Sequence, residues 1–135
     1  MRSEFIPEAT DGGARAGSVT TPAGPFRTPC FMPVGTRGAV RHLSSTDLAD
    51  LGAEVVLANT GRLMLRPGAD IVRDLGGLGA FAAWDGLTLT DSGGYQIFSL
   101  QPKVDDDGAV FRSTYDGSTH RLTPEGAAGV QADLG

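Results

Sequence analysis

Three short apolar segments alternate with segments of helical periodicity, and this alternation most limits the folds open to the chain. The apolar segments are residues 30–34, 54–58 and 87–90. Between them, one predicted helix runs from a cap cluster at 44–47 to Gly52, and another runs from Pro67 to Gly76. Continuous apolar strands are typical of parallel sheets that are covered on both faces. The pattern therefore predicts the α/β class, as an open doubly wound sheet or a (β/α)8 barrel.

A closed barrel does not fit in this chain. Eight βα repeats usually take about 250 residues, and the chain has 135. The fold class expected from the pattern is therefore α/β, with only part of a (β/α)8 TIM barrel present if the barrel alternative holds.

The segments outside the alternation predict antiparallel structure. Residues 1–14 are polar and without periodicity, so we expect a flexible N-terminus followed by one folded unit over 15–135. A strand over 15–21 and the turn signal at 21–25 predict an N-terminal β-hairpin. Strands at 98–100, 103–107, 110–112 and 120–122, joined by Asp-Gly turns, predict an antiparallel β insertion. Thr123 and Pro124 open a last helix as its cap and first residue.

Charge and composition exclude several classes of protein. The net charge of −5 argues, taken alone, against a dedicated nucleic-acid binder, whose usual footprint is basic. No apolar run reaches the roughly 20 residues that cross a bilayer, and the N-terminus lacks a signal-like stretch. We therefore expect a cytoplasmic protein. The lone cysteine, Cys30, and the distant His42 and His120 cannot form the usual four-ligand zinc site, so no metal site is expected in this chain.

The sharpest motif is TDSGGYQ at residues 90–96. Asp91 follows a predicted parallel strand, at the end where open α/β sheets and barrels bind ligands. Gly93 and Gly94 let the backbone come close to a ligand, and Tyr95 suits stacking on a planar one. A structural interpretation stays open, in which Asp91 and Ser92 cap a helix and the glycines form a tight turn. Pattern alone does not separate the two.

The remaining candidates are open between binding and structural roles, or favour structural ones. Asn59 ends the second predicted strand, where its amide suits holding a ligand or a neighbouring loop. The three aspartates at 105–107 alternate in direction along a strand, which favours a solvated turn over a metal site. Cys30 lies in an apolar run and is expected to be a buried, inert thiol. Arg62 and Arg66, one helical turn apart, suit phosphate contact or a solvated rim.

Several strings, in the same order, closely resemble the amino-terminal part of tRNA-guanine transglycosylases, also called queuine tRNA-ribosyltransferases. The resemblance covers about residues 18–135. The strings are TPCFMPVGT (28–36), LANT (57–60), LMLRPG (63–68), WDG (84–86), TDSGGYQ (90–96), VDDDG (104–108), FRS (111–113) and HRLTPE (120–125).

This resemblance implies a TIM barrel with a zinc-binding insertion. The family exchanges the wobble guanine of certain tRNAs for a 7-deazaguanine base on the path to queuosine. One aspartate attacks the ribose, and a second, which matches Asp91, is the general base. Ser92, Gly93, Gly94 and Tyr95 match the base-binding segment, and Asn59 matches a position near the ribose. The nucleophile, the zinc ligands and most of the tRNA-docking surface match nothing in these 135 residues. We expect a homodimer at full length and an inactive fragment.

Two departures from the family pattern keep alternatives open. Gly61 and Arg62 stand where members usually carry Tyr-His, which changes the loop after the second strand. The short length also fits a truncated, non-catalytic family member or a subunit-like partner. The DNA downstream of Gly135 separates this alternative from an active enzyme. A relative acting on 7-cyano-deazaguanine in archaeal-type tRNA is a third interpretation, but the antiparallel insertion favours the bacterial and eukaryotic branch.

Overall fold

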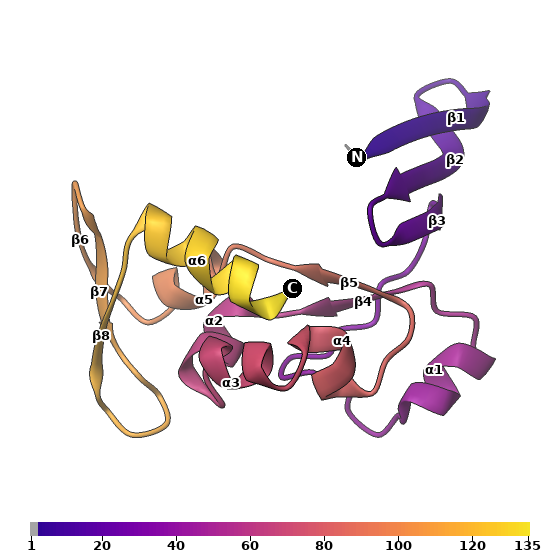
Figure 1. Ribbon diagram of the computed structural model, residues 1–135. Helices are drawn as coiled ribbons and strands as arrows, with labels where there is room; N and C mark the ends of the chain where they lie inside the picture. Colours follow the sequence, from indigo (N-terminus) through magenta and orange to yellow (C-terminus); the bar gives the residue numbers. More distant parts are fainter. Residues whose placement is uncertain (1–2) are drawn as a thin grey trace.

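The computed structural model describes residues 3–135 and shows a mixed α/β protein with small sheets (Figure 1). An antiparallel sheet, β1–β2–β3, stands at one end of the molecule, and a second, β6–β7–β8, stands at the other. The parallel pair β4–β5 and most of the helices lie between them. The α/β class is confirmed, and the described residues contain no closed barrel.

The N-terminal sheet contains the predicted hairpin and one further strand. Its members are β1 (Glu4–Asp11), β2 (Ala14–Thr21) and β3 (Gly24–Thr28). The predicted flexible terminus is wrong for residues 4–11, because β1 pairs with β2 from Glu4↔Thr20 to Asp11↔Ala14. All of β1 is exposed. Hydrogen bonds to β2, and not a buried apolar face, therefore hold it in place. Residues 1–2, which the same prediction covered, lie outside the described residues.

The parallel unit positions the candidate site. Strands β4 (Val55–Ala58) and β5 (Leu87–Thr90) pair in parallel, from Val55↔Leu87 to Ala58↔Thr90. The predicted strand at 30–34 is wrong as a full strand, because it contributes only an isolated parallel bridge between Val34 and Leu57. Pro29 and Pro33 lack the N–H groups that a ladder needs. The order across this small sheet is Val34, β4, β5.

Helix predictions succeed where a cap and periodicity agree. The helix after Ser44 is confirmed as α1 (Ser45–Asp50), and Ser44 and Asp47 form a reciprocal capping box. The helix predicted from Pro67 is α3, which begins two residues later and follows Gly68 at φ +120°. These two helices lie after Val34 and after β4 in the chain, as the alternation requires.

Two helices were not predicted, α2 (Thr60–Leu65) and α4 (Gly77–Ala82), and α5 (Gly94–Phe98) was expected only in the capping interpretation of the motif. All three are short. Helices of five or six residues span less than two turns, which is too few for a periodic apolar pattern. The glycines that begin α4 and α5 are residue types that normally end helices. The strand expected at 98–100 is wrong for the same reason, since Phe98 is the last residue of α5.

The antiparallel insertion is confirmed as β6 (Lys103–Asp105), β7 (Gly108–Arg112) and β8 (Thr119–Leu122). Asp105 accepts from Arg121 at 2.5 Å, so the acidic run is a solvated, ion-paired turn. The last helix is confirmed as α6 (Pro124–Leu134), with Thr123 Oγ1 accepting from the N–H of Gly126.

The main core lies where α6 packs on α2, α3 and α4. Its buried members are Ala58, Leu63, Ala69, Val72, Leu78 and Leu134. A second cluster joins α1 to β4 through Leu48, Val56 and Trp84. Within residues 3–135, no helix has both the length and the apolar content to cross a membrane.

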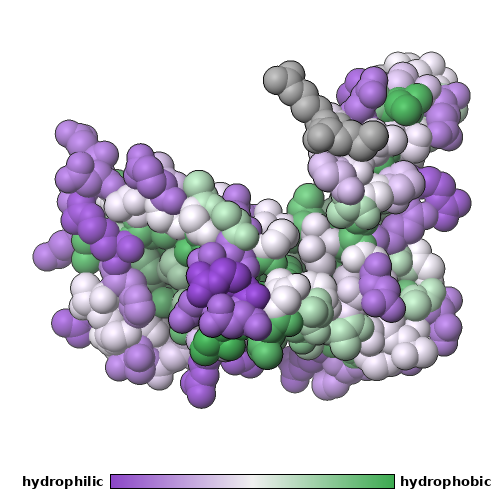
Figure 2. Space-filling model, viewed as in Figure 1, coloured by the Kyte–Doolittle hydropathy of each residue, from purple (hydrophilic) through white to green (hydrophobic). Residues whose placement is uncertain are grey.

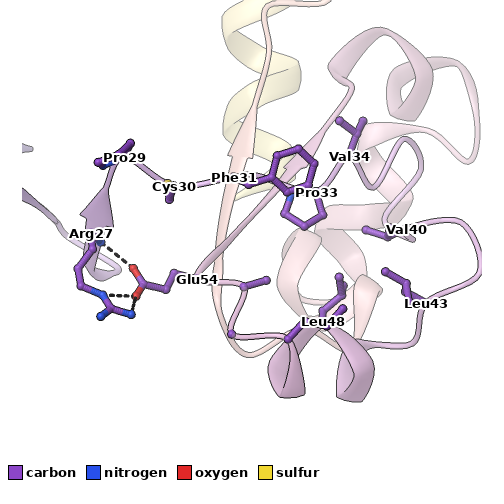
Figure 3. Close-up of a pocket in the computed structure, with 13 residues that line it drawn as sticks. Arg27, Pro29, Cys30, Phe31, Pro33, Val34, Val40, Leu43, Leu48 and Glu54 are labelled. Carbon is purple, nitrogen blue, oxygen red and sulfur yellow. Dashed lines mark hydrogen bonds and ion pairs between the residues drawn. The ribbon is translucent and has the colours of Figure 1, made fainter. Parts of the chain in front are cut away.

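Large apolar side chains also remain at the surface. Phe31 is 85% exposed and Leu51 is 72% exposed. Figure 2 shows hydrophobic residues reaching the outside of the molecule between polar regions. Both residues line a hollow of about 660 Å³ between α1 and the segment that leads from β3 (Figure 3).

Candidate active site

Two polar residues lie side by side at the carboxyl edge of the parallel pair. Asn59 directly follows β4, and Asp91 directly follows β5. The N–H of Asp91 donates to the carbonyl of Ala58 at 3.3 Å, which extends the parallel ladder by one residue. The predicted placement of both residues at the strand ends is confirmed.

The carboxylate of Asp91 is held by four hydrogen bonds. Oδ1 accepts from the main-chain N–H groups of Thr60 at 2.9 Å and Gly93 at 3.0 Å. Oδ2 accepts from Asn59 Nδ2 at 2.6 Å and from Gln96 Nε2 at 2.8 Å. A carboxylate offers about four lone-pair positions, so these donors fill them all. The half-buried side chain of Asp91 therefore ties the turn after β4 to the turn after β5.

The main chain of Asp91 is fixed as firmly as its side chain. The hydroxyl of Thr60 and Nε2 of Gln131 both donate to the Asp91 carbonyl, the latter at 2.9 Å. Thr60 is fully buried, and Gln131 comes from α6. The site thus joins three segments, and the outermost residues, Asn59 and Gln131, are 72 positions apart along the chain.

The capping interpretation of this motif is present in the geometry. Asp91 Oδ1 bonds the first N–H of α2 and the N–H of Gly93, which precedes α5. Ser92 Oγ accepts from the N–H of Gly94 at 3.3 Å. These contacts leave the chemical role of the motif open, because a carboxylate that is firmly positioned suits structure and catalysis alike.

Gly93 is required by its surroundings. Its φ of +74° disfavours other residues, and a Cβ at this position would lie 3.0 Å from the main-chain nitrogen of Gly61. Gly61 itself is buried in α2 but is less constrained. A Cβ there would make ordinary contacts at 3.4–3.5 Å with Gly93 and Gln96.

Tyr95 extends from the site into solvent. Its side chain is 81% exposed, and Phe98, one turn further along α5, is 74% exposed. An exposed ring beside a fixed carboxylate suits a planar, polar ligand, because the face stacks while the edge meets hydrogen-bonding groups.

Sequence reasoning missed Thr60, Gln96 and Gln131 as parts of the site. Gln96 was inside the quoted motif and Thr60 followed Asn59, so their proximity had a signal. Nothing in the sequence indicated that their side chains point toward Asp91. Gln131 had no signal at all, since only packing of α6 brings it to Asp91.

The other candidates lie outside this cluster. Arg62 reaches Thr114 Oγ1 at 3.5 Å, and Arg66 lies 5.8 Å from the ring centroid of Tyr115, so both contact the β7–β8 connection. In that connection, hydrogen bonds from Ser118 lower the pKa of Asp116 to about 2. These interactions brace the antiparallel sheet against α2.

The residues present do not fit a metal site. No group of three or more His, Cys, Asp or Glu side chains converges anywhere in residues 3–135. His120 bonds Ser118 Oγ at 2.7 Å and stacks on Phe111. The prediction of a buried Cys30 is wrong, because Cys30 is exposed in the segment that links β3 to α1.

The hollow beside α1 is separate from Asp91. Its lining is mainly apolar, and Arg27 and Glu54 form an ion pair at its rim (Figure 3). It offers no cluster of converging hydrogen-bonding groups comparable to the one around Asp91.

Fold and site together define an α/β protein with a polar site at the carboxyl ends of parallel strands. Comparison with protein families matches residues 10–135 to the family described as queuine tRNA-ribosyltransferase. The chain belongs to this family.

Individual relatives agree with the family match. The chain is 51% identical over 130 residues to a queuine tRNA-ribosyltransferase of Herpetosiphon aurantiacus, covering 95% of this chain and 33% of that protein. It is 53% identical over 133 residues to one of Gloeobacter violaceus, covering 97% and 35%. A Thermus thermophilus relative is 51% identical, covering 97% and 34%. The chain thus spans about a third of the length of these curated relatives.

Proposed function

We propose that these residues are the amino-terminal portion of a tRNA-guanine transglycosylase. This pentosyltransferase exchanges the guanine at the tRNA wobble position for a 7-deazaguanine base in queuosine biosynthesis. Family membership supports the reaction class, and the names of the relatives support the tRNA substrate. The observation that carries the site assignment is the Asp91 carboxylate, fixed at the strand edge beside Asn59, with the exposed ring of Tyr95 four residues further along the chain.

In this proposal Asp91 is the general base, which takes the ring-nitrogen proton of the incoming base as the glycosidic bond forms. Its four hydrogen bonds fill its lone pairs, so one internal donor must yield to the substrate. The two main-chain donors are fixed by the turns, which leaves the side-chain donors on Oδ2 to yield. Asp91 therefore offers Oδ2 to the base while Oδ1 keeps the turns in place.

The neighbouring residues take the rest of the base and the sugar. The segment from Ser92 to Tyr95 forms the base-binding face, with Tyr95 stacked on the ring and the Gly94 main chain close to its edge. Asn59 lies near the ribose. The exposure of Ser92 and Tyr95, which follow Asp91 in the chain, supports these roles, because a ligand can reach both side chains.

Other parts of the reaction fall to residues beyond this chain. We propose that the βα units form the start of a (β/α)8 TIM barrel, completed by the length that the relatives have in addition. The nucleophilic aspartate would come from that part, and so would the zinc ligands, since the residues here do not fit that metal. A homodimer and a cytoplasmic location complete the proposal.

The test is exchange of labelled guanine into tRNA, measured with the isolated chain and with the full-length protein that contains it. We expect incorporation by the full-length protein and none by the isolated chain. A folded full-length protein that incorporates no label would contradict the proposal and favour a non-catalytic family member. The coding sequence downstream of Gly135 gives a second test, since a continuous reading frame of family length is expected.

A further inference from the structure

We propose that Gln96 is a positioning residue for Asp91 and that its second amide atom accepts a hydrogen bond from the substrate. This inference rests on the proposed transglycosylase function and adds a residue to its site. It begins from the two oxygens of Asp91, which are held in different ways. Main-chain groups fix Oδ1, whereas only the side chains of Asn59 and Gln96 fix Oδ2.

The orientation of the Gln96 amide follows from its partner. An ionised carboxylate only accepts hydrogen bonds, so the NH2 group of Gln96 must face Asp91, as it does at 2.8 Å. Oε1 of Gln96 must then point the other way. This atom is buried and has no hydrogen-bond partner within the described part of the chain.

An unpaired buried acceptor is uncommon and calls for a donor. On the side of α2 that faces it, Gly61 has no side chain that could donate. A Cβ at Gly61 would lie 3.5 Å from Gln96 Oε1, and glycine leaves that place empty. Nε2 keeps Asp91 oriented until the base arrives. When Gln96 gives up Oδ2 to the base, its amide moves, and Oε1 accepts a hydrogen bond from a hydroxyl or N–H group of the bound nucleoside.

Four variants of the full-length protein separate these two functions. Gln96→Met removes both donor and acceptor, whereas Gln96→Glu keeps an acceptor but cannot donate to Asp91. Gly61→Ser places a hydroxyl within reach of Oε1 and so competes with the substrate. Gln101→Met is the matched control, because it makes the same substitution at an exposed glutamine that follows α5 outside the site.

The expected result is a split between kcat and KM in the labelled-guanine exchange assay. Gln96→Met lowers kcat about tenfold and raises KM for tRNA or guanine about 2–10-fold, the usual range for one hydrogen bond. Gln96→Glu lowers kcat at least as much, with KM near the wild-type value. Gly61→Ser raises KM while raising the melting temperature, because it satisfies the buried acceptor. Gln101→Met leaves both constants within about twofold of the wild type.

The substrate side of the contact is resolved by which KM changes. A rise for guanine indicates a donor on the base, and a rise for tRNA alone indicates a ribose hydroxyl. If the wild type exchanges guanine and both Gln96 variants keep its kcat and KM, this inference is overturned and the proposed function stays intact. Changes in kcat and KM that merely follow the melting temperature of each variant would overturn it as well. Absence of exchange by the folded wild type would overturn both.

Discussion

The side-chain amide of Asn59 lies 2.6 Å from the carboxylate of Asp91, although 32 positions separate the two residues in the chain. They meet because each follows one of two neighbouring parallel strands, whose carboxyl ends share an edge. The contact joins the turn that begins α2 to the turn that begins α5. The candidate site therefore joins the ends of two neighbouring strands.

Replacement of Asp91 by Asn is expected to abolish most of the exchange activity of the full-length protein. General-base catalysis typically contributes about 10²–10⁴-fold, so turnover should fall by at least about 10²-fold. In Asp91→Asn, an NH2 group replaces one carboxylate oxygen and cannot accept the hydrogen bonds that this oxygen receives. Thermal stability should therefore fall as well. Steady-state incorporation of labelled guanine measures the first effect.

The exposed carboxylate of Asp106 provides the control for this experiment. Asp106→Asn changes the net charge equally but lies in the solvated β6–β7 turn. It should leave turnover unchanged. Near wild-type turnover in folded Asp91→Asn would show that Asp91 serves only as a cap.

Tyr95→Ala should weaken substrate binding with little effect on stability. Its ring is 81% exposed, so the fold loses few contacts, whereas base–aromatic stacking is worth roughly 1–3 kcal/mol. KM should rise about 5–150-fold, and Tyr95→Phe should retain most of the affinity. Phe98→Ala, on the same helix and similarly exposed, tests whether any exposed ring here matters. An equal loss in both alanine variants would contradict a specific role for Tyr95.

Thr60→Val should destabilise the protein through the loss of one buried hydrogen bond. The Thr60 side chain is fully buried, and its hydroxyl donates to the main-chain carbonyl of Asp91. The carbonyl still accepts from Gln131, so the loss of one of its two hydrogen bonds costs about 0.5–1.5 kcal/mol. Urea unfolding measures this loss. Thr60→Ser keeps the hydroxyl and should recover most of the difference, and a valine variant as stable as the wild type would refute the assignment.

The N-terminal sheet should loosen at acid pH. Glu54 accepts from the main-chain N–H and the guanidinium of Arg27 at 2.6–2.7 Å, which joins β3 to the residue before β4. These hydrogen bonds lower the pKa of Glu54 below its ordinary value of 4.5. A group with a lowered pKa stabilises the fold above its unfolded pKa and ceases to do so as pH falls through the folded value.

Amide hydrogen exchange across β3 reports this loosening. Corrected for the intrinsic pH dependence, protection should be constant above pH 4.5 and decrease below it. Glu54→Gln should show weaker protection at neutral pH and lose this acid transition. A transition that persists unchanged in Glu54→Gln would assign it to another carboxylate.

The isolated 135-residue chain is expected to self-associate. Phe31, Leu51 and Phe98 are each more than 70% exposed, and β5 has one unpaired edge among the described residues. Analytical ultracentrifugation should show species larger than the monomer, and heating should give a broad transition. A single monomeric species with a sharp transition would contradict this expectation. Replacing Phe31 and Leu51 with Ser should reduce the association.

The sequence alone determined the class of fold, most of the strands, and the strand-end position of Asp91 and Asn59. It did so because burial on two faces requires continuous apolar strands at 54–58 and 87–90, and because Ser44 and Thr123 mark helix starts chemically. The order of the motifs also determined the family. These are local signals, which each segment carries within itself.

Only the tertiary structure decided which groups surround Asp91. The amide of Gln131 reaches it because α6 packs on α2 and α3, and the Gln96 side chain reaches it because α5 turns back at Gly93. The same holds for β1, whose polar residues give no pattern but pair with β2 through the main chain. Contacts between segments distant in sequence depend on packing geometry, which no local pattern records.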